Sequence, residues 1–91
     1  MKIYIAGKIT GNPSFEDDFE QAELTLKAQG HTPLNPAKLP QRLSYEDYMH
    51  ICFSMIDVAE ELFLLPNWKE SPGARREFGY ALKNGKKIYK G

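Results

Sequence analysis

Short apolar runs alternate along the chain with longer segments in which apolar residues return every three or four positions. The first run, Lys2–Ala6, is rich in β-branched and aromatic residues and stops at a glycine, as a buried strand does. The run at residues 62–65 is continuous and suits a central parallel strand. Shorter runs at His31–Leu34 and Lys87–Tyr89 predict two more strands, and Pro33 restricts the former to a sheet edge or a strand end.

Three segments show helical spacing. The first runs from about Ser14 to Gln29, the second opens at Ser44, and the third reaches from Pro72 to about Asn84. A serine precedes each helix, and in the first two an aspartate three residues later resembles a capping box. We expect the second helix to bury Tyr45, Tyr48, Met49, Cys52, Ile56 and Ala59, and the third to bury Ala74, Phe78, Ala81 and Leu82.

The predicted order β-α-β-α-β-α-β is typical of an α/β fold. Strands separated by helices run parallel with right-handed crossovers, so we expect a doubly wound, three-layer sheet of about four strands in one domain, residues 1–91. Ligands bind such sheets beyond the carboxyl ends of the strands. The loops at 7–13, 35–43 and 66–73 are therefore the candidate site.

Composition narrows the function classes. Twelve basic residues balance twelve acidic ones, which disfavours a nucleic-acid polymer as partner. The single cysteine, Cys52, fits a reducing compartment, and no apolar run approaches the roughly 20 residues of a membrane span. We therefore expect a cytoplasmic protein. His31 and His50 show no ligand spacing with Cys52, so no metal site is predicted, and the basic cluster Lys83, Lys86, Lys87 and Lys90 is expected to be a solvated face.

The third helix carries the most informative acidic residue, Glu77. Its neighbours three and four positions away are Gly73, Ala74, Tyr80 and Ala81, so the usual i,i+4 ion pair of a solvated glutamate is missing. Glu77 falls at the margin of the apolar face, and Gly73 leaves space in front of its carboxylate. A carboxylate at the rim of a cleft can act as a nucleophile or general base, while a plain solvated helix residue is the alternative.

Other candidates also have structural alternatives. The loop GKITGNP places Gly7 and Gly11 after a strand, as phosphate loops require, but its spacing is neither GxGxxG nor a P-loop. Ser71 is either a ligand contact or a plain N-cap. Trp68 either stacks on a base or covers the core, and Tyr4 either points its hydroxyl toward the ligand or is simply packed in the sheet.

Several of these motifs together resemble the nucleoside 2-deoxyribosyltransferase superfamily. They are YIAG followed by ITG, then Asn35-Pro36, then SPGARREFGYALKNGK, so that the resemblance runs from about Lys2 to Lys87. The piece LLPNWKESPGA is most similar to a short branch common in phages and bacteria, DUF4406. The first loop and the surroundings of Ser71 are also similar to the 2′-deoxynucleoside 5′-phosphate N-hydrolases.

The resemblance implies a flavodoxin-like sheet and attack by Glu77 on the anomeric carbon of a deoxyribosyl group, with retention overall. It implies that Tyr4 positions this nucleophile and that Ser71 binds a 5′-phosphate. The first loop matches at Gly7, Ile9 and Gly11, whereas Lys8 and Thr10 replace a serine and an arginine. We further expect substrate contacts from Lys8, Thr10, Gly11, Asn35, Trp68 and Gly73. Carboxylate attack on a glycoside needs no cofactor, and the resemblance implies a homodimer or higher homo-oligomer.

The sequence departs from the family pattern at the group that protonates the leaving base. Family enzymes carry an aspartate on the second helix, and the matching position here falls on Cys52 or Phe53. Asp57 is nearby but falls on a different helical face. Three classes therefore stay open: an enzyme acting on the N-glycosidic bond of a deoxynucleoside or its 5′-monophosphate, a non-catalytic module that binds a nucleotide derivative, and a scaffold protein.

Overall fold

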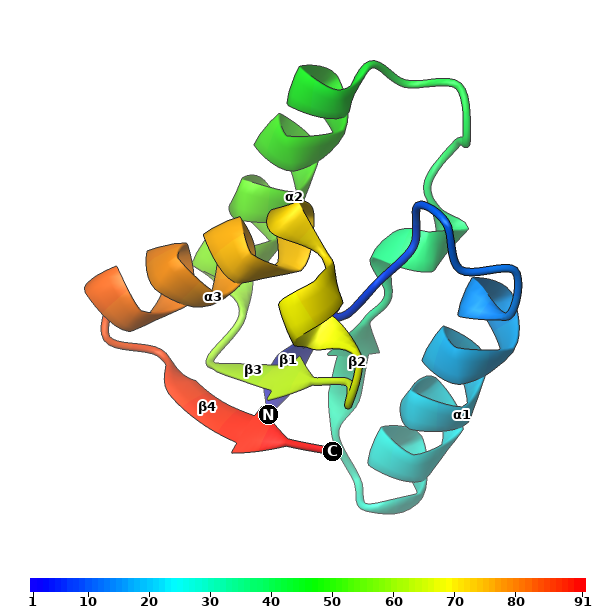
Figure 1. The fold of residues 1–91 in the computed structure, drawn as a ribbon. Helices are drawn as coiled ribbons and strands as arrows, with labels where there is room; N and C mark the ends of the chain where they lie inside the picture. Colours follow the sequence, from blue (N-terminus) through cyan, green and yellow to red (C-terminus); the bar gives the residue numbers. More distant parts are fainter.

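The computed structural model describes residues 1–91 and has the predicted alternation of strands and helices. The four strands form one sheet in the order β2-β1-β3-β4, with every neighbouring pair parallel, which confirms the α/β class (Figure 1). The elements are β1 (Lys2–Ala6), α1 (Phe15–Ala28), β2 (Thr32–Leu34), η1 (Pro36–Lys38), α2 (Tyr45–Val58), β3 (Glu61–Leu64), η2 (Trp68–Glu70), α3 (Pro72–Lys83) and β4 (Lys87–Lys90).

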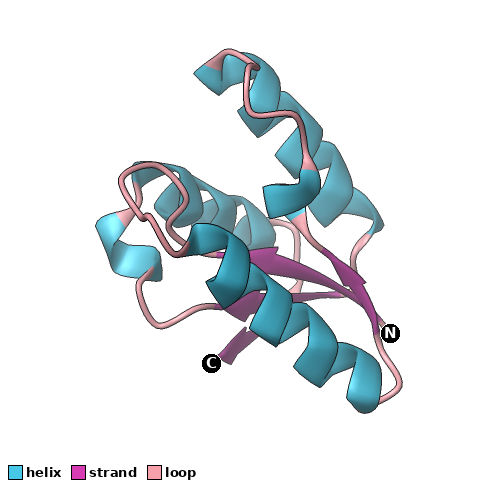
Figure 2. Cartoon of the chain, turned by 90° about the vertical axis from the view of Figure 1, so that its right-hand side faces the viewer, coloured by secondary structure: helices cyan, strands magenta, loops and turns pink.

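Helices cover both faces of the sheet (Figure 2). Successive side chains of a strand point to opposite faces, and β1 shows the consequence. Ile3 and Ile5 pack with α1 residues such as Phe19, whereas Tyr4 and Ala6 pack with residues of α2 and α3. The protein therefore has two small apolar cores, one on each side of the sheet, and β1 contributes to both.

Serine caps open two of the three helices as predicted. The Ser44 hydroxyl accepts a hydrogen bond from the Asp47 amide at 3.1 Å, and Ser71 does the same for Ala74 at 3.1 Å. The capping box predicted at Ser14 is wrong, because its side chain makes no cap hydrogen bond. Asn12 organises that turn instead, since its amide group donates to a carboxylate oxygen of Asp18 at 3.0 Å and its Oδ1 accepts from the Ser14 amide.

Four smaller predictions need correction. Leu82 is 53% exposed rather than part of the buried face of α3, and Tyr45 is 50% exposed rather than part of the buried stripe of α2. The third strand begins at Glu61, one residue earlier than predicted, and ends at Leu64. Lys86 is not a purely solvated lysine, because its Nζ donates to the carbonyls of Asp57 at 3.1 Å and Ala59 at 2.8 Å. Its ammonium group thus supplies hydrogen bonds to carbonyls at the C-terminal end of α2.

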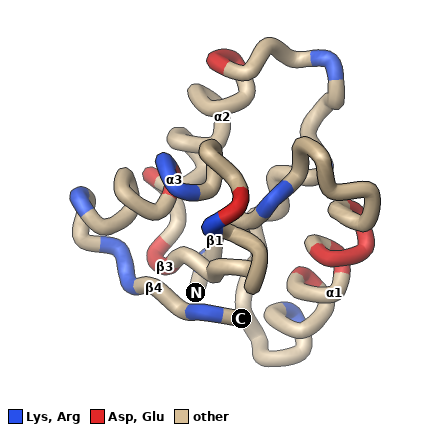
Figure 3. Tube along the Cα trace, in the orientation of Figure 1, with Lys and Arg blue, Asp and Glu red and all other residues tan.

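Charge is distributed unevenly over the molecule (Figure 3). Acidic residues gather on α1, and lysines gather near the end of α3 and along β4.

None of the helices combines the length and the apolar content that crossing a bilayer requires.

Candidate active site

A cavity of about 410 Å³ lies beyond the carboxyl ends of the strands, where the sheet topology predicts a ligand site. All three candidate loops contribute to its wall, together with the first turns of α2 and α3. The lining residues are Tyr4, Gly7, Ile9, Thr10, Pro36, Ala37, Pro40, Gln41, Leu43, Tyr45, Tyr48, Met49, Ser71, Pro72, Gly73, Ala74 and Glu77.

Glu77 and Tyr4 meet in this cavity although 73 positions separate them in the sequence. The Tyr4 hydroxyl donates to Oε2 of Glu77 at 2.7 Å. Glu77 was expected at the margin of the apolar face of α3, but its residual exposure is only 4%. The face that β1 presents to α2 and α3 carries Tyr4, so the alternation of the strand brings its hydroxyl to the carboxylate.

Burial sets the charge state of Glu77. Loss of hydration raises the pKa of its carboxyl from 4.5 to about 7, because a low-dielectric environment disfavours the ionised form. The Tyr4 hydrogen bond, the neighbouring Cys52 thiol and the charge of Arg76 lower this pKa but only in part. A carboxylate with a pKa near neutrality can exchange between its charged and neutral forms at working pH, as acid, base or nucleophile chemistry requires.

The start of α3 shapes the wall in front of this carboxylate. A Cβ atom placed on Gly73 would contact Sδ of Met49 at 3.4 Å, and side-chain atoms of Ser71 and Tyr45 at 3.8 Å, so the absence of a side chain keeps the cavity open there. Ser71 both caps α3 and lines the cavity. Its oxygen accepts the Ala74 amide, which leaves the hydroxyl proton free to donate to a ligand.

The first loop contributes only part of its predicted contacts. Gly7, Ile9 and Thr10 line the cavity, whereas Lys8 and Gly11 do not. The Lys8 ammonium pairs with Glu70 at 3.3 Å. Gly11 has a φ of 77°, a left-handed conformation that favours glycine, so its role in the turn is conformational.

Family membership follows from a match that spans nearly the whole chain. Residues 1–90 match the family described as "Domain of unknown function (DUF4406)". The chain belongs to this family. The resemblance drawn from the sequence motifs is thereby confirmed at the level of this branch, and no curated protein matches the chain.

Three solved structures share the fold of this DUF4406 domain. A 2-deoxyribosyltransferase from Bacillus psychrosaccharolyticus has a TM-score of 0.77 and 22% identity, over 99% of this chain and 71% of that one. A 2-desoxiribosyltransferase from Leishmania mexicana has a TM-score of 0.78 and 21% identity, over 98% and 62%. The CMP N-glycosidase BcmB from Clostridium botulinum has a TM-score of 0.74 and 21% identity, over 99% and 67%. The DUF4406 domain thus spans about two thirds of the length of these chains.

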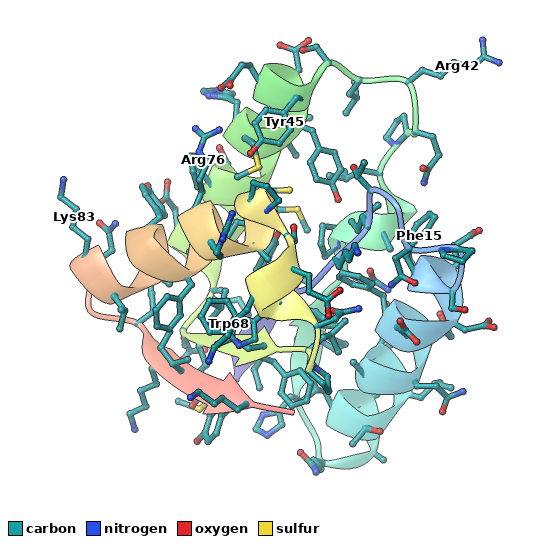
Figure 4. The ribbon with its side chains drawn as sticks, in the orientation of Figure 1. Phe15, Arg42, Tyr45, Trp68, Arg76 and Lys83 are labelled. Atoms are coloured by element: carbon teal, nitrogen blue, oxygen red, sulfur yellow. The ribbon has the colours of Figure 1, made fainter.

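Besides Lys8 and Gly11, two more predicted contact residues of the DUF4406 domain lie outside the cavity lining. Asn35 caps η1 by accepting the Ala37 amide at 2.9 Å, and its Nδ2 donates to the buried Glu23 at 3.3 Å, so it holds the loop in place. The Trp68 ring packs on Phe78, with 4.7 Å between the ring centroids (Figure 4). Of the two alternatives for Trp68, the geometry favours the one in which its ring covers the core.

The sequence motifs missed one wall of the cavity. Tyr45, Tyr48 and Met49 line it from α2, although their spacing indicated only a buried helical stripe. Tyr48 also donates its hydroxyl to the carbonyl of Pro36 at 3.2 Å, which joins α2 to the second loop. The available signal was two tyrosines one turn apart at the start of a helix that follows a candidate ligand loop.

Proposed function

We propose that this protein cleaves the N-glycosidic bond of a deoxynucleoside or deoxynucleoside 5′-monophosphate, with Glu77 as the nucleophile. The deoxyribosyl group then passes to water or to a second base. The observation that carries the proposal is a buried carboxylate inside a cavity, held by a 2.7 Å hydrogen bond from Tyr4 and free of any ion pair. A carboxylate without a counter-ion is costly to bury, so its retention at the cavity wall favours a chemical role over a purely structural one.

The chemistry is that of a retaining glycosidase. Glu77 attacks the anomeric carbon, the bond to the base breaks, and a glycosyl ester forms on the carboxylate. Attack by water or by a second base on the opposite side of the same carbon then releases the sugar and restores the glutamate. Tyr4 acts as a positioning residue, because its hydroxyl fixes one carboxylate oxygen and leaves the other available.

The size and chemistry of the cavity support this class of substrate. Its volume of about 410 Å³ falls within the range of small-molecule sites, which is roughly 300–1,000 Å³. Apolar side chains such as Ile9, Leu43 and Met49 suit a base, and the hydroxyls of Thr10 and Ser71 suit a sugar or its 5′ end. The fold shared with two 2-deoxyribosyltransferases and a CMP N-glycosidase supports the same class of reaction.

A second candidate is a module that binds a nucleotide derivative without turning it over. Most glycosidases use a pair of carboxyl groups, and Glu77 is the one carboxyl group among the lining residues. Cys52, one of the two positions where the resemblance implies an aspartate, is fully buried, and burial raises the pKa of its thiol to about 12. A thiol with that pKa does not deliver a proton efficiently near neutral pH.

Base release separates the two candidates. Wild-type protein and Glu77→Gln are incubated with each deoxynucleoside and each 5′-monophosphate, and the free base is followed by chromatography. Release by the wild type alone supports the enzyme, and addition of a second base distinguishes transfer from hydrolysis. Binding of the same compounds by calorimetry without any release by the wild type would support the binding module over cleavage of these bases.

A further inference from the structure

The charge of the cavity is unbalanced when Glu77 is ionised. Glu77 is the one charged side chain among the seventeen that line it, and the remaining polar groups are hydroxyls and the amide of Gln41. The ionised Glu77 carboxylate is 4% exposed, and the cavity wall gives it the hydrogen bond from Tyr4 but no cation. A bound ligand is the remaining source of a counter-ion.

The basic side chains of Arg76 and Lys8 contact other groups. The Arg76 guanidinium lies over the rings of Tyr45 and Phe53, 5.5 Å from each centroid, and Nη1 is 3.5 Å from the carboxylate of Glu46 (Figure 4). Its side chain is 42% exposed, and its influence on the pKa of Glu77 is smaller than that of burial or of the Tyr4 hydrogen bond.

Lys8 is also paired, with Glu70 of η2 at 3.3 Å. Arg42 extends from the second loop away from the body of the molecule, as Figure 4 shows. The positive charge that would balance an ionised Glu77 is therefore not supplied by either neighbouring loop.

The leaving group poses a second, independent requirement. A neutral purine or pyrimidine departs as an anion unless an acid protonates it, and a positioned acid contributes about 10²–10⁴-fold to such a step. Apart from Glu77, which is consumed as nucleophile, the lining offers only hydroxyls, and burial raises the pKa of both Tyr4 and Tyr48. No lining side chain is suited to protonate a neutral base.

Both requirements are met by one class of substrate. Building on the proposed function, we infer that the preferred substrate is a nucleoside whose base already carries a positive charge, a pyridinium N-glycoside being the simplest case. The charged ring balances Glu77, and it departs as a neutral molecule without a proton. Tyr45 and Tyr48 line the same cavity, and aromatic rings attract a cationic ring.

The reaction balances without a further reagent. An oxygen of Glu77 forms a bond to the anomeric carbon, and the electron pair of the carbon–nitrogen bond stays on the ring nitrogen, which becomes neutral. Water then attacks the same carbon, the ester bond to Glu77 breaks, and one proton is released to solvent. The products are the neutral base, the free sugar and the ionised glutamate.

The test compares a permanent cation with neutral substrates. Release of nicotinamide from nicotinamide 2′-deoxyriboside is measured beside release of base from the four common 2′-deoxynucleosides, with Glu77→Gln and buffer subtracted as background. We expect kcat/KM for the cation to exceed that for every neutral nucleoside by at least about a hundredfold, the contribution of the missing acid. Neutral nucleosides cleaved within tenfold of the cation would overturn the inference and leave the proposed function intact.

Binding provides the second readout. At pH 8.5, where Glu77 is ionised, Glu77→Gln should bind the pyridinium nucleoside at least tenfold more weakly than the wild type. The same substitution should leave binding of the uncharged 1,4-dihydronicotinamide form unchanged. Equal weakening for both forms would refute the charge argument, and absence of release from every compound would refute the proposed function itself.

Discussion

The substitution Glu77→Gln is expected to stabilise the protein above neutral pH while abolishing its activity. Gln keeps the shape of the side chain and an oxygen for the Tyr4 hydroxyl, which now lies 2.7 Å from Glu77. It removes the buried charge, whose cost is what raises the pKa of Glu77 from 4.5 to about 7. Because one pKa unit corresponds to about 1.4 kcal/mol, the rise corresponds to about 3 kcal/mol.

The sign follows from proton binding. Between pH 4.5 and about 7 the folded protein keeps the proton on Glu77 while the unfolded chain loses it, so the stability of the wild type falls as the pH rises. Glu77→Gln lacks this loss. The variant and the wild type should therefore be similarly stable near pH 4.5, and the variant should gain progressively until the difference levels off above pH 7.

Urea unfolding from pH 4.5 to 8.5 measures the difference, since small single domains usually unfold in one transition. Every other titrating group is common to both proteins and cancels. Glu16→Gln is the matched control, because Glu16 is exposed on α1, and its effect should stay within about 0.5 kcal/mol at every pH. A Glu77→Gln variant that is less stable than the wild type at pH 8 would refute the conclusion that the buried, ionised carboxylate of Glu77 destabilises the folded protein.

Three further substitutions test the packing and polarity around the site. Tyr4→Phe removes a hydrogen bond that lowers the pKa of Glu77, so the pH midpoint of base release should move upward. Because a hydrogen bond to a charged group is worth about 1.5–3 kcal/mol, activity at pH 7 should fall by about ten- to a hundredfold. An unchanged pH profile would contradict this role of Tyr4. Gly7→Ala should destabilise the protein by about 1–3 kcal/mol in urea unfolding, because the new Cβ would lie 2.6 Å from Cδ1 and 2.9 Å from Cβ of Leu65. Gly79→Ala, in the middle of α3 with no atom within 4 Å of the new Cβ, should instead raise stability by up to about 1 kcal/mol, and destabilisation there would show that the helix is packed more tightly than described.

The sequence predicted the fold well because its patterns are local. Each strand is a short apolar run, and two of the three helices open at a serine whose hydroxyl caps the first turn. Ser14 failed as a cap because Asn12, two residues earlier, competes for the same turn and binds Asp18. The competition depends on loop geometry, which periodicity does not encode.

The cavity lining was predictable where neighbouring residues of one element carry it. Glu77 and Gly73 lie on a single helix, Gly7, Ile9 and Thr10 lie in a single loop, and all five line the cavity. Asn35 and Lys8 were assigned to the substrate by position in a loop, and in the structure their polar atoms bind Glu23 and Glu70 instead. Partners that distant in sequence are set by how the loops fold against α1 and η2.

Mass spectrometry of the trapped protein tests whether Glu77 is the nucleophile. The protein is mixed with the substrate that gives base release, quenched in acid within the first turnovers, and digested, with Glu77→Gln treated in parallel. We predict that the peptide carrying Glu77 gains the mass of one deoxyribosyl group in the wild type and none in the variant. Base release by the wild type with the added mass on another residue, or with the same adduct in Glu77→Gln, would contradict the assignment of Glu77 as the nucleophile.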